Sequence, residues 1–318
     1  MSNDALESTK HTANYTSSEI KLHEIEDASI AVRVFGSGPA LVFIHGYPVN
    51  GYTWRKLLPK LSTRFTCYVI DLPGLGDSLW TEGTNFSFTA QARRLDGLIR
   101  KLNLTNFAIV AHDTGATIAR LVAISQAENV SKLAIINTEI PGHRPPWVQF
   151  YQHMAKLPLA QGMFRLCMKS KLFLRSTMGL GQFYSNRELF NDPASLGPYI
   201  SPLVNEPQRL KGALNYLKGI EWDVVDQLEV QLKDIAAEVL FIWGENDKTF
   251  PVHLAEKMCI QFRRAPGFVR ISSASLMPHE EKPYEMLIHL IPFLANKMKH
   301  DKVTERENET LVNVSGFV

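Results

Sequence analysis

The sequence predicts an α/β fold in which helices cover both faces of a mostly parallel sheet. Short β-branched runs alternate with helix-length amphipathic stretches, as in successive β-α-β units. Runs such as LVFI and AIIN are apolar without interruption, which is typical of strands that are covered on both faces. With 318 residues, 45% of them hydrophobic and 21% charged, the chain can build one large core or two smaller ones.

The predicted strands are short apolar segments, most of them separated by helix-length sequence. They cover residues 30–35, 41–44, 68–70, 107–111, 133–137, 239–243 and 268–271. Ligands of open α/β sheets bind beyond the carboxyl ends of the strands. The residues that directly follow these strands are therefore candidate site residues.

One internal region departs from this rhythm. Residues 141–226 are rich in Pro, Gly and aromatic residues and contain helical pieces without a convincing strand. We expect an inserted helical cap there, between two halves of one core at 19–140 and 227–299. The polar ends, residues 1–18 and 300–318, are predicted to be flexible.

Composition and charge exclude several classes of partner. Lys and Arg number 34 and Asp and Glu 32, a net charge of +2, so no strong field attracts nucleic acid or an anionic membrane. The three cysteines have no disulfide or zinc spacing, and neither a secretory leader nor eighteen uninterrupted apolar residues occur. We expect a cytoplasmic protein without metal, cofactor or stable membrane insertion that binds a small apolar or mildly polar molecule. The sequence does not indicate its oligomeric state.

The most informative segment is NFAIVAHDTGATIARLVA, residues 106–123. An apolar strand leads through Ala-His-Asp-Thr-Gly into an amphipathic helix, the pattern of a nucleophile elbow that exposes one side chain above the sheet. That side chain is usually serine and is Asp113 here. The alternative is that Asp113 only caps the following helix, a common role of aspartate.

Three further segments follow other predicted strands. HGYP (residues 45–48) follows LVFI, where backbone N–H groups can stabilise an oxyanion, and Asp247 and His279 follow two later strands. Each alone has an ordinary interpretation: HGYP can be a plain turn, Asp247 a turn residue, and His279 a surface or core histidine. Together they supply nucleophile, acid and base in one characteristic chain order.

With these residues the chain resembles α/β-hydrolases that use an aspartate nucleophile, the epoxide hydrolases and the haloalkane or haloacid dehalogenases. The resemblance covers roughly residues 25–298 and is strongest at HGYP, DLPGLGDS, AHDTGA, GENDKTFP and MPHEEKP. It implies a mostly parallel eight-stranded sheet with a helical cap. It also implies nucleophile Asp113, acid Asp247, base His279, and oxyanion donors in the backbone N–H groups of Tyr47 and Thr114.

The chemistry implied by this resemblance has two steps. An ionised carboxylate attacks a saturated carbon and forms an alkyl ester, without first losing a proton. Water activated by His279 then hydrolyses that ester. Replacement of His279 is therefore expected to trap the ester, and replacement of Asp113 to prevent it.

Local differences within the family favour epoxides over halides. Haloalkane dehalogenases usually carry a tryptophan after the nucleophile and the fluoroacetate type an arginine, whereas this chain has Thr114. Epoxide hydrolases resemble the chain in His-Gly-aromatic-Pro and in Asn-Thr at residues 137–138. LNYLK (214–218) resembles their cap motif, although Leu217 takes the place of the ring-opening tyrosine and Tyr216 lies beside it.

We therefore predict hydrolysis of epoxides to diols, with water as co-substrate and dehalogenation as the alternative. A cofactor-free oxygenase and a non-catalytic ligand-binding protein are further alternatives. Glu139 is a reserve candidate for the acid, and the tyrosines of the cap have the alternative of plain aromatic packing. The candidate substrate-binding residues are His45, Tyr216, Tyr184, Tyr199 and Trp243, with Tyr151 as a further phenol.

Overall fold

The computed structural model describes residues 10–11 and 14–296. The predicted flexible tail, 300–318, and residues 1–9 and 12–13 of the predicted N-terminal segment lie outside the described residues. Tyr15 belongs to that N-terminal segment and lies within the described residues. Its ring is buried, stacks on Phe35 with centroids 6.0 Å apart and lies 4.8 Å from the Arg33 guanidinium carbon.

The described residues form one nine-stranded sheet rather than the expected eight strands. The strands are β1 (Lys21–Ile25), β2 (Ala28–Phe35), β3 (Ala40–Ile44), β4 (Thr66–Asp71), β5 (Leu79–Trp80), β6 (Phe107–His112), β7 (Val130–Ile136), β8 (Glu238–Gly244) and β9 (Gly267–Ile271). All predicted strands are present with bounds shifted by a few residues. The two unpredicted strands, β1 and β5, pair only with β2.

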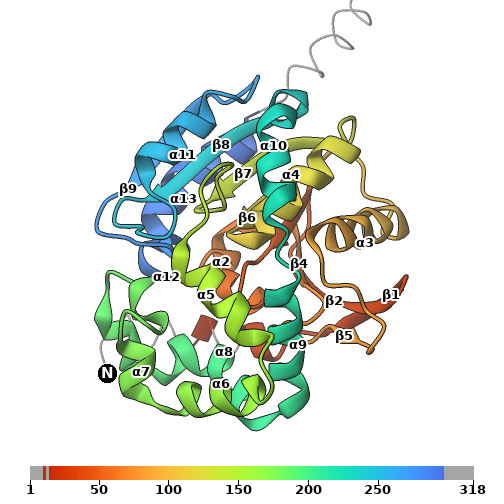
Figure 1. Cartoon of the computed structure of the whole chain (residues 1–318). Coiled ribbons are helices and arrows are strands. Elements are labelled where there is room, and N and C mark those ends of the chain that lie inside the picture. The colour runs from red at the N-terminus through yellow and green to blue at the C-terminus, as the bar shows by residue number, and fades with distance from the viewer. Residues whose placement is uncertain (1–9, 12–13, 297–318) are drawn as a thin grey trace, which may run out of the picture.

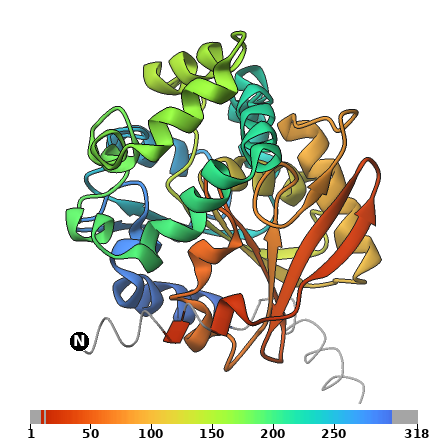
Figure 2. The same cartoon turned by 90° about the horizontal axis from the view of Figure 1, so that it is seen from below.

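The sheet order is β1-β2-β4-β3-β6-β7-β8-β9, with β5 beside β2. From β4 to β9 along this path neighbouring strands are parallel, whereas β2 is antiparallel to β1, β4 and β5. The β1–β2 hairpin stands at one edge of the molecule (Figure 2). Strand β6 is buried along its whole length, which explains its uninterrupted apolar sequence.

Helices flank the sheet and close one end of it. The core elements are η1 (Gly51–Trp54), α2 (Leu58–Leu61), α3 (Phe88–Lys101), α4 (Thr114–Ser125), η4 (Leu232–Asp234), α11 (Val252–Cys259), α12 (Pro278–Glu281) and α13 (Pro283–Ala295). The cap elements are α5 (Pro146–Ala155), α6 (Ala160–Lys169), α7 (Lys171–Arg175), η2 (Leu180–Gln182), η3 (Arg187–Phe190), α8 (Pro193–Asn205), α9 (Pro207–Lys218) and α10 (Trp222–Gln231).

The cap is the helical unit expected between β7 and β8. Helices α5 to α9 gather at one end of the sheet, and α10 leads back toward the strands (Figure 1). Helix α9 packs against α5, α6 and α8. Within the described part of the chain, no helix is long and apolar enough to cross a membrane.

Candidate active site

Asp113 lies at a sharp turn between β6 and α4. Its backbone has φ 52° and ψ −133°, a conformation that is unusual for a residue with a side chain. Two glycines make room for the turn. A Cβ on Gly46 would lie 2.3 Å from the Asp113 Cβ, and one on Gly115 would lie 2.2 Å from the His45 carbonyl oxygen. The local sequence thus builds the elbow that the strand-turn-helix pattern predicts.

The Asp113 carboxylate is held by backbone N–H groups. The N–H of Tyr47 donates to Asp113 Oδ2 at 2.8 Å, and the N–H of Thr114 also favours the charged carboxylate. Asp113 stands at the N-cap position of α4, but apart from the contact with Thr114 its side chain makes no capping hydrogen bond to this helix. The two residues predicted as oxyanion donors therefore lie against the candidate nucleophile.

Opposing effects act on the pKa of Asp113. Burial raises it, the nearby Glu139 carboxylate raises it further, and the two backbone N–H groups lower it. The net result is a pKa well above the usual range of aspartate. Since only the ionised form is a nucleophile, the protonated fraction is unreactive.

This shift predicts a pH dependence of any reaction at Asp113. Below the raised pKa the initial rate of ester formation should fall about tenfold per pH unit, because it follows the ionised fraction. The Glu139→Gln variant should move the midpoint to lower pH, because it removes a negative charge that raises this pKa. Initial rates across pH test both statements, and an unchanged midpoint in Glu139→Gln would contradict them.

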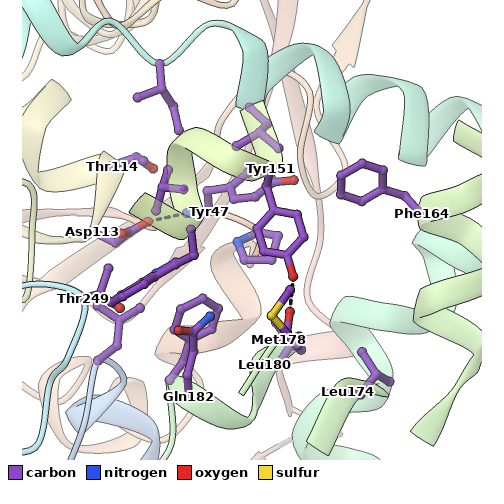
Figure 3. Close-up of a pocket in the computed structure, with 18 of the residues that line it drawn as sticks. Tyr47, Asp113, Thr114, Tyr151, Phe164, Leu174, Met178, Leu180, Gln182 and Thr249 are labelled. Carbon is purple, nitrogen blue, oxygen red and sulfur yellow. Dashed lines mark hydrogen bonds between the residues drawn. The ribbon is translucent and has the colours of Figure 1, made fainter. Parts of the chain in front are cut away.

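Asp113 lines a pocket of about 120 Å³ between the sheet and the cap. In Figure 3, Asp113 and Tyr47 lie at one side, with Phe164 and Leu174 of the cap across from them. Most of its lining is apolar, from Val148, Met168, Phe173, Met178, Leu180, Phe183, Ile200, Leu217, Ile220, Phe250 and Leu276. A cavity of about 150 Å³ holds benzene, so this pocket fits a small apolar molecule.

The structure does not bring His279 into this pocket. Its Nε2 lies 2.6 Å from the Thr53 hydroxyl, and its ring packs on Trp54 and His112 at centroid distances of 4.8 and 4.5 Å. His279 Nδ1 is buried without a hydrogen-bond partner among the described groups. Burial and the charges of Arg55 and Lys56 lower the pKa of His279 to about 3, so the ring is neutral.

Local helix formation explains why His279 lies elsewhere. His279 follows β9 in the chain, as the predicted strand order has it, but Pro278 begins helix α12 and carries His279 into a helical turn. Glu280 on the same turn accepts a hydrogen bond from Arg55 Nη1 and from the Tyr199 hydroxyl, each at 2.5 Å. A proline at the start and two glutamates in the first turn, Glu280 and Glu281, are typical of a helix start, so the sequence carried a signal for α12.

This placement predicts that His279 does not act on Asp113. In the His279→Gln variant, rates of adduct formation and loss on Asp113 should stay within about twofold of wild type, whereas thermal stability should fall by about 1 kcal/mol from the altered buried hydrogen bond with Thr53. Time-resolved intact mass and thermal melting measure the two effects. A much longer-lived adduct in this variant would restore His279 as the base.

Asp247 is buried beside the strand end of β8, as predicted, but no histidine contacts its carboxylate among the described residues. Oδ1 accepts from the N–H groups of Thr249 and Phe250 at 2.7 and 3.1 Å, and Oδ2 accepts from Asn137 Nδ2 at 2.7 Å. Burial raises its pKa to about 7, although these donors lower it. Among the described residues, these neutral donors hold the Asp247 carboxylate without a cationic partner.

Sequence reasoning missed several residues of the pocket wall. Leu276 lines the pocket together with Thr249 and Phe250, the two residues whose N–H groups hold Asp247. Trp147 of α5 also lines it, and its indole N–H is buried without a hydrogen-bond partner among the described groups. Apolar residues after a strand carry no chemical signature, so only the tertiary structure identifies them.

Two of the predicted substrate-binding residues, His45 and Trp243, form hydrogen bonds with backbone groups. His45 Nδ1 lies 2.9 Å from the Gly46 carbonyl oxygen, and its Nε2 accepts from the Leu72 N–H at 2.9 Å. Trp243 Nε1 donates to the Phe250 carbonyl oxygen at 2.8 Å. Neither side chain lines the pocket. Both rings are fully buried and their polar atoms are used by backbone groups.

The three cap tyrosines predicted to bind substrate, Tyr216, Tyr184 and Tyr199, do not line the pocket either. Tyr216 donates to Thr114 Oγ1 at 3.0 Å and stacks on Tyr47, while the next residue, Leu217, lines the pocket. A one-residue step turns a side chain by about 100° around a helix, which separates the two. Tyr184 packs on Phe190 and Tyr199 binds Glu280, and neither lines the pocket.

Tyr151 and Glu139, the further phenol and the alternative acid of the sequence prediction, do line the pocket. The Tyr151 hydroxyl donates to the Met178 carbonyl oxygen. Glu139 Oε2 accepts from the Thr117 hydroxyl at 2.6 Å, and burial raises the pKa of this carboxyl. In the part of the chain that the structure covers, no group of three or more His, Cys, Asp or Glu side chains could hold a metal ion.

Known proteins with similar sequences carry different names. The chain is 28% identical over 221 residues to the magnesium-chelatase 30 kDa subunit of Rhodobacter capsulatus, covering 69% of this chain and 74% of that protein. It is 34% identical over 123 residues to a fluoroacetate dehalogenase of Burkholderia, covering 37% and 40%. It is 22% identical over 277 residues to human epoxide hydrolase 4, covering 81% and 74%.

Solved structures with the same architecture include the unliganded epoxide hydrolase CorEH. It superposes with a TM-score of 0.70 at 20% identity, covering 87% of this chain and 99% of that one, which supports the fold alone. The model of the family described as the alpha/beta hydrolase fold matches residues 39–282. With its parallel sheet, elbow and helical cap, the chain belongs to the α/β-hydrolase fold family.

Proposed function

We propose that the protein reacts with small epoxides through Asp113, which forms an alkyl ester with the opened substrate. The observation that carries this proposal is an Asp113 carboxylate at the wall of an apolar pocket, with the Tyr47 N–H on Oδ2 at 2.8 Å. A carboxylate held in this way presents an oxygen to an electrophile bound in a mostly apolar pocket. The resemblance to epoxide hydrolases and the 22% identity to human epoxide hydrolase 4 agree with this chemistry.

The proposed step balances without a cofactor. An Asp113 oxygen attacks one ring carbon, the bond from that carbon to the epoxide oxygen breaks, and the released alkoxide takes a proton from water. The adduct therefore keeps the full mass of the epoxide. With a haloalkane, the carbon-halogen bond breaks and halide leaves, so the adduct lacks the halogen.

Dehalogenation is the second candidate, and Trp147 favours it. The chain lacks a tryptophan after the nucleophile, but the unpartnered indole N–H of Trp147 belongs to a residue of the pocket wall. An indole N–H is a donor without acceptor capacity and suits a departing halide. The Trp147→Phe variant should therefore slow alkylation by haloalkanes more than alkylation by epoxides.

Intact-mass spectrometry with two size-graded panels tests the proposal. Small terminal epoxides and matched haloalkanes of three to six carbons should add to the protein, and much larger epoxides should not, because the pocket holds about 120 Å³. Adducts of full epoxide mass support the first candidate, and adducts without halogen support the second. A protein that binds these molecules reversibly but forms no adduct would be a ligand-binding member of the family instead.

A further inference from the structure

None of the described residues that line the pocket is a histidine. Three buried histidines use ring nitrogens in hydrogen bonds outside the pocket wall. His45 bonds to Gly46 and Leu72, His112 to the Leu276 carbonyl oxygen, and His279 to the Thr53 hydroxyl. His143 donates Nε2 to the Thr249 carbonyl oxygen at 2.8 Å and is not part of the wall. The nucleophile therefore has no imidazole neighbour in the pocket.

Leu276 lines the same pocket as Asp113. Its carbonyl oxygen accepts from Nε2 of His112, the residue before Asp113, at 2.9 Å. Its loop lies against the loop that holds Asp247, because the Asn246 N–H donates to the Ala274 carbonyl oxygen at 2.9 Å. Leu276 thus follows a segment that is anchored to both the nucleophile strand and the acid loop, and its side chain is apolar.

The hydrogen-bond partners of Asp247 also lack a histidine among the described residues. The N–H groups of Thr249 and Phe250 donate to Oδ1, Asn137 Nδ2 donates to Oδ2, and the Thr249 side chain is a further hydrogen-bond partner of this carboxylate. All of these partners are neutral, so among the described residues no cation or imidazole hydrogen-bonds to this carboxylate. Asp247 is therefore a buried carboxylate of the kind that orients a catalytic imidazole, but no described histidine hydrogen-bonds to it.

We propose that Leu276 stands at the position of the missing base, so that the protein carries out ester formation on Asp113 but does not hydrolyse the ester. This inference rests on the proposed function. Without an imidazole at this position the attacking water lacks the family's usual proton acceptor, and a positioned general base contributes about 10²- to 10⁴-fold. The protein would then retain one small electrophile covalently per chain rather than turn it over.

The Leu276→His variant tests this inference. Wild-type protein is treated with 1,2-epoxybutane, freed of excess reagent and followed by intact mass and diol analysis. We expect wild type to hold one adduct per chain without sustained diol release, and Leu276→His to lose the adduct at least about 100-fold faster with release of diol. Leu276→Gln, polar but without a basic ring, is the matched control and should keep the adduct.

A second variant covers the case in which histidine at 276 does not fold. Leu276→Ala opens space at the same place, and free imidazole should accelerate loss of its adduct but not that of wild type. Adding Asp247→Asn to Leu276→His should reverse most of the gain, because the acid then no longer carries a charge to orient the ring. Thermal melting verifies that each variant is folded.

The outcomes separate this inference from the proposed function. Absence of any adduct would overturn the proposed function. Sustained diol release by wild type, dependent on Asp113, would keep the proposed function and overturn the inference; Glu139→Gln and His143→Gln would then identify the base. A folded Leu276→His protein that forms a persistent adduct would overturn the placement of the missing base at residue 276.

Discussion

The Asp113→Asn variant should form no covalent adduct with any small epoxide or haloalkane. Asparagine keeps the shape of the side chain but lacks the nucleophilic carboxylate, and removal of a covalent nucleophile lowers rates by about 10⁴-fold or more. Peptide mapping of the wild-type adduct should place the added mass on the peptide that contains Asp113. Single-turnover incubation followed by intact mass measures the loss directly.

Asp223→Asn is a suitable control for this experiment. Asp223 lies on α10, its side chain is 88% exposed, and it pairs with Arg144 away from the pocket wall. The Asp223→Asn variant removes one negative charge, as Asp113→Asn does, but leaves the pocket unchanged. Its adduct yield should therefore match that of wild type. Adduct formation by Asp113→Asn at the wild-type rate would show that another nucleophile reacts, and the assignment of Asp113 would fail.

The Gly115→Ala variant should be strongly destabilised. A Cβ at this position would lie 2.2 Å from the His45 carbonyl oxygen and 2.7 Å from that of Ile44, which are backbone atoms that cannot rotate away. The end of β3 and the start of α4 would have to separate. We expect the free energy of unfolding to fall by about 3 kcal/mol, the upper end of the usual range for overpacking. Thermal or urea denaturation measures the change in free energy of unfolding.

Gly162→Ala provides the matched comparison. Gly162 lies inside α6, and a Cβ there meets nothing within 4 Å. Alanine is a better helix former than glycine, so this variant should gain about 0.5–1 kcal/mol. Equal stability of the two variants would show that the close approach of β3 and α4 at Gly115 does not constrain the fold.

The elbow could be predicted because it is built from local signals. One apolar strand, a short turn with Gly115 and one amphipathic helix are consecutive in the chain, and together they fix the backbone of Asp113. The neighbouring HGYP segment directly follows β3, which pairs with β6 in parallel. Strand ends that meet at one edge bring the Tyr47 N–H to Asp113, so this contact also follows from chain order.

The two strands β1 and β5 could not be predicted from apolar runs in the sequence. The burial of β1 is low along most of its length, so its sequence KLHEI lacks the apolar run that marks the central strands. Strand β5 has only two residues and exists because β2 offers it hydrogen-bonding partners. Both strands depend on pairing with β2, and such pairing leaves little trace in the sequence of a short segment.

By itself the sequence determined the fold family, the cap between β7 and β8, and Asp113 at the elbow, because uninterrupted apolar runs and one tight turn are properties of contiguous residues. Only the tertiary structure decided which side chains face the pocket. Helix phase puts Leu217 rather than Tyr216 on the wall, and a helix begun by Pro278 takes His279 to Thr53 and leaves Leu276 in the pocket. These choices depend on how separate elements pack, and a shift of one residue or one turn, which pattern reasoning cannot resolve, changes the chemistry of the site.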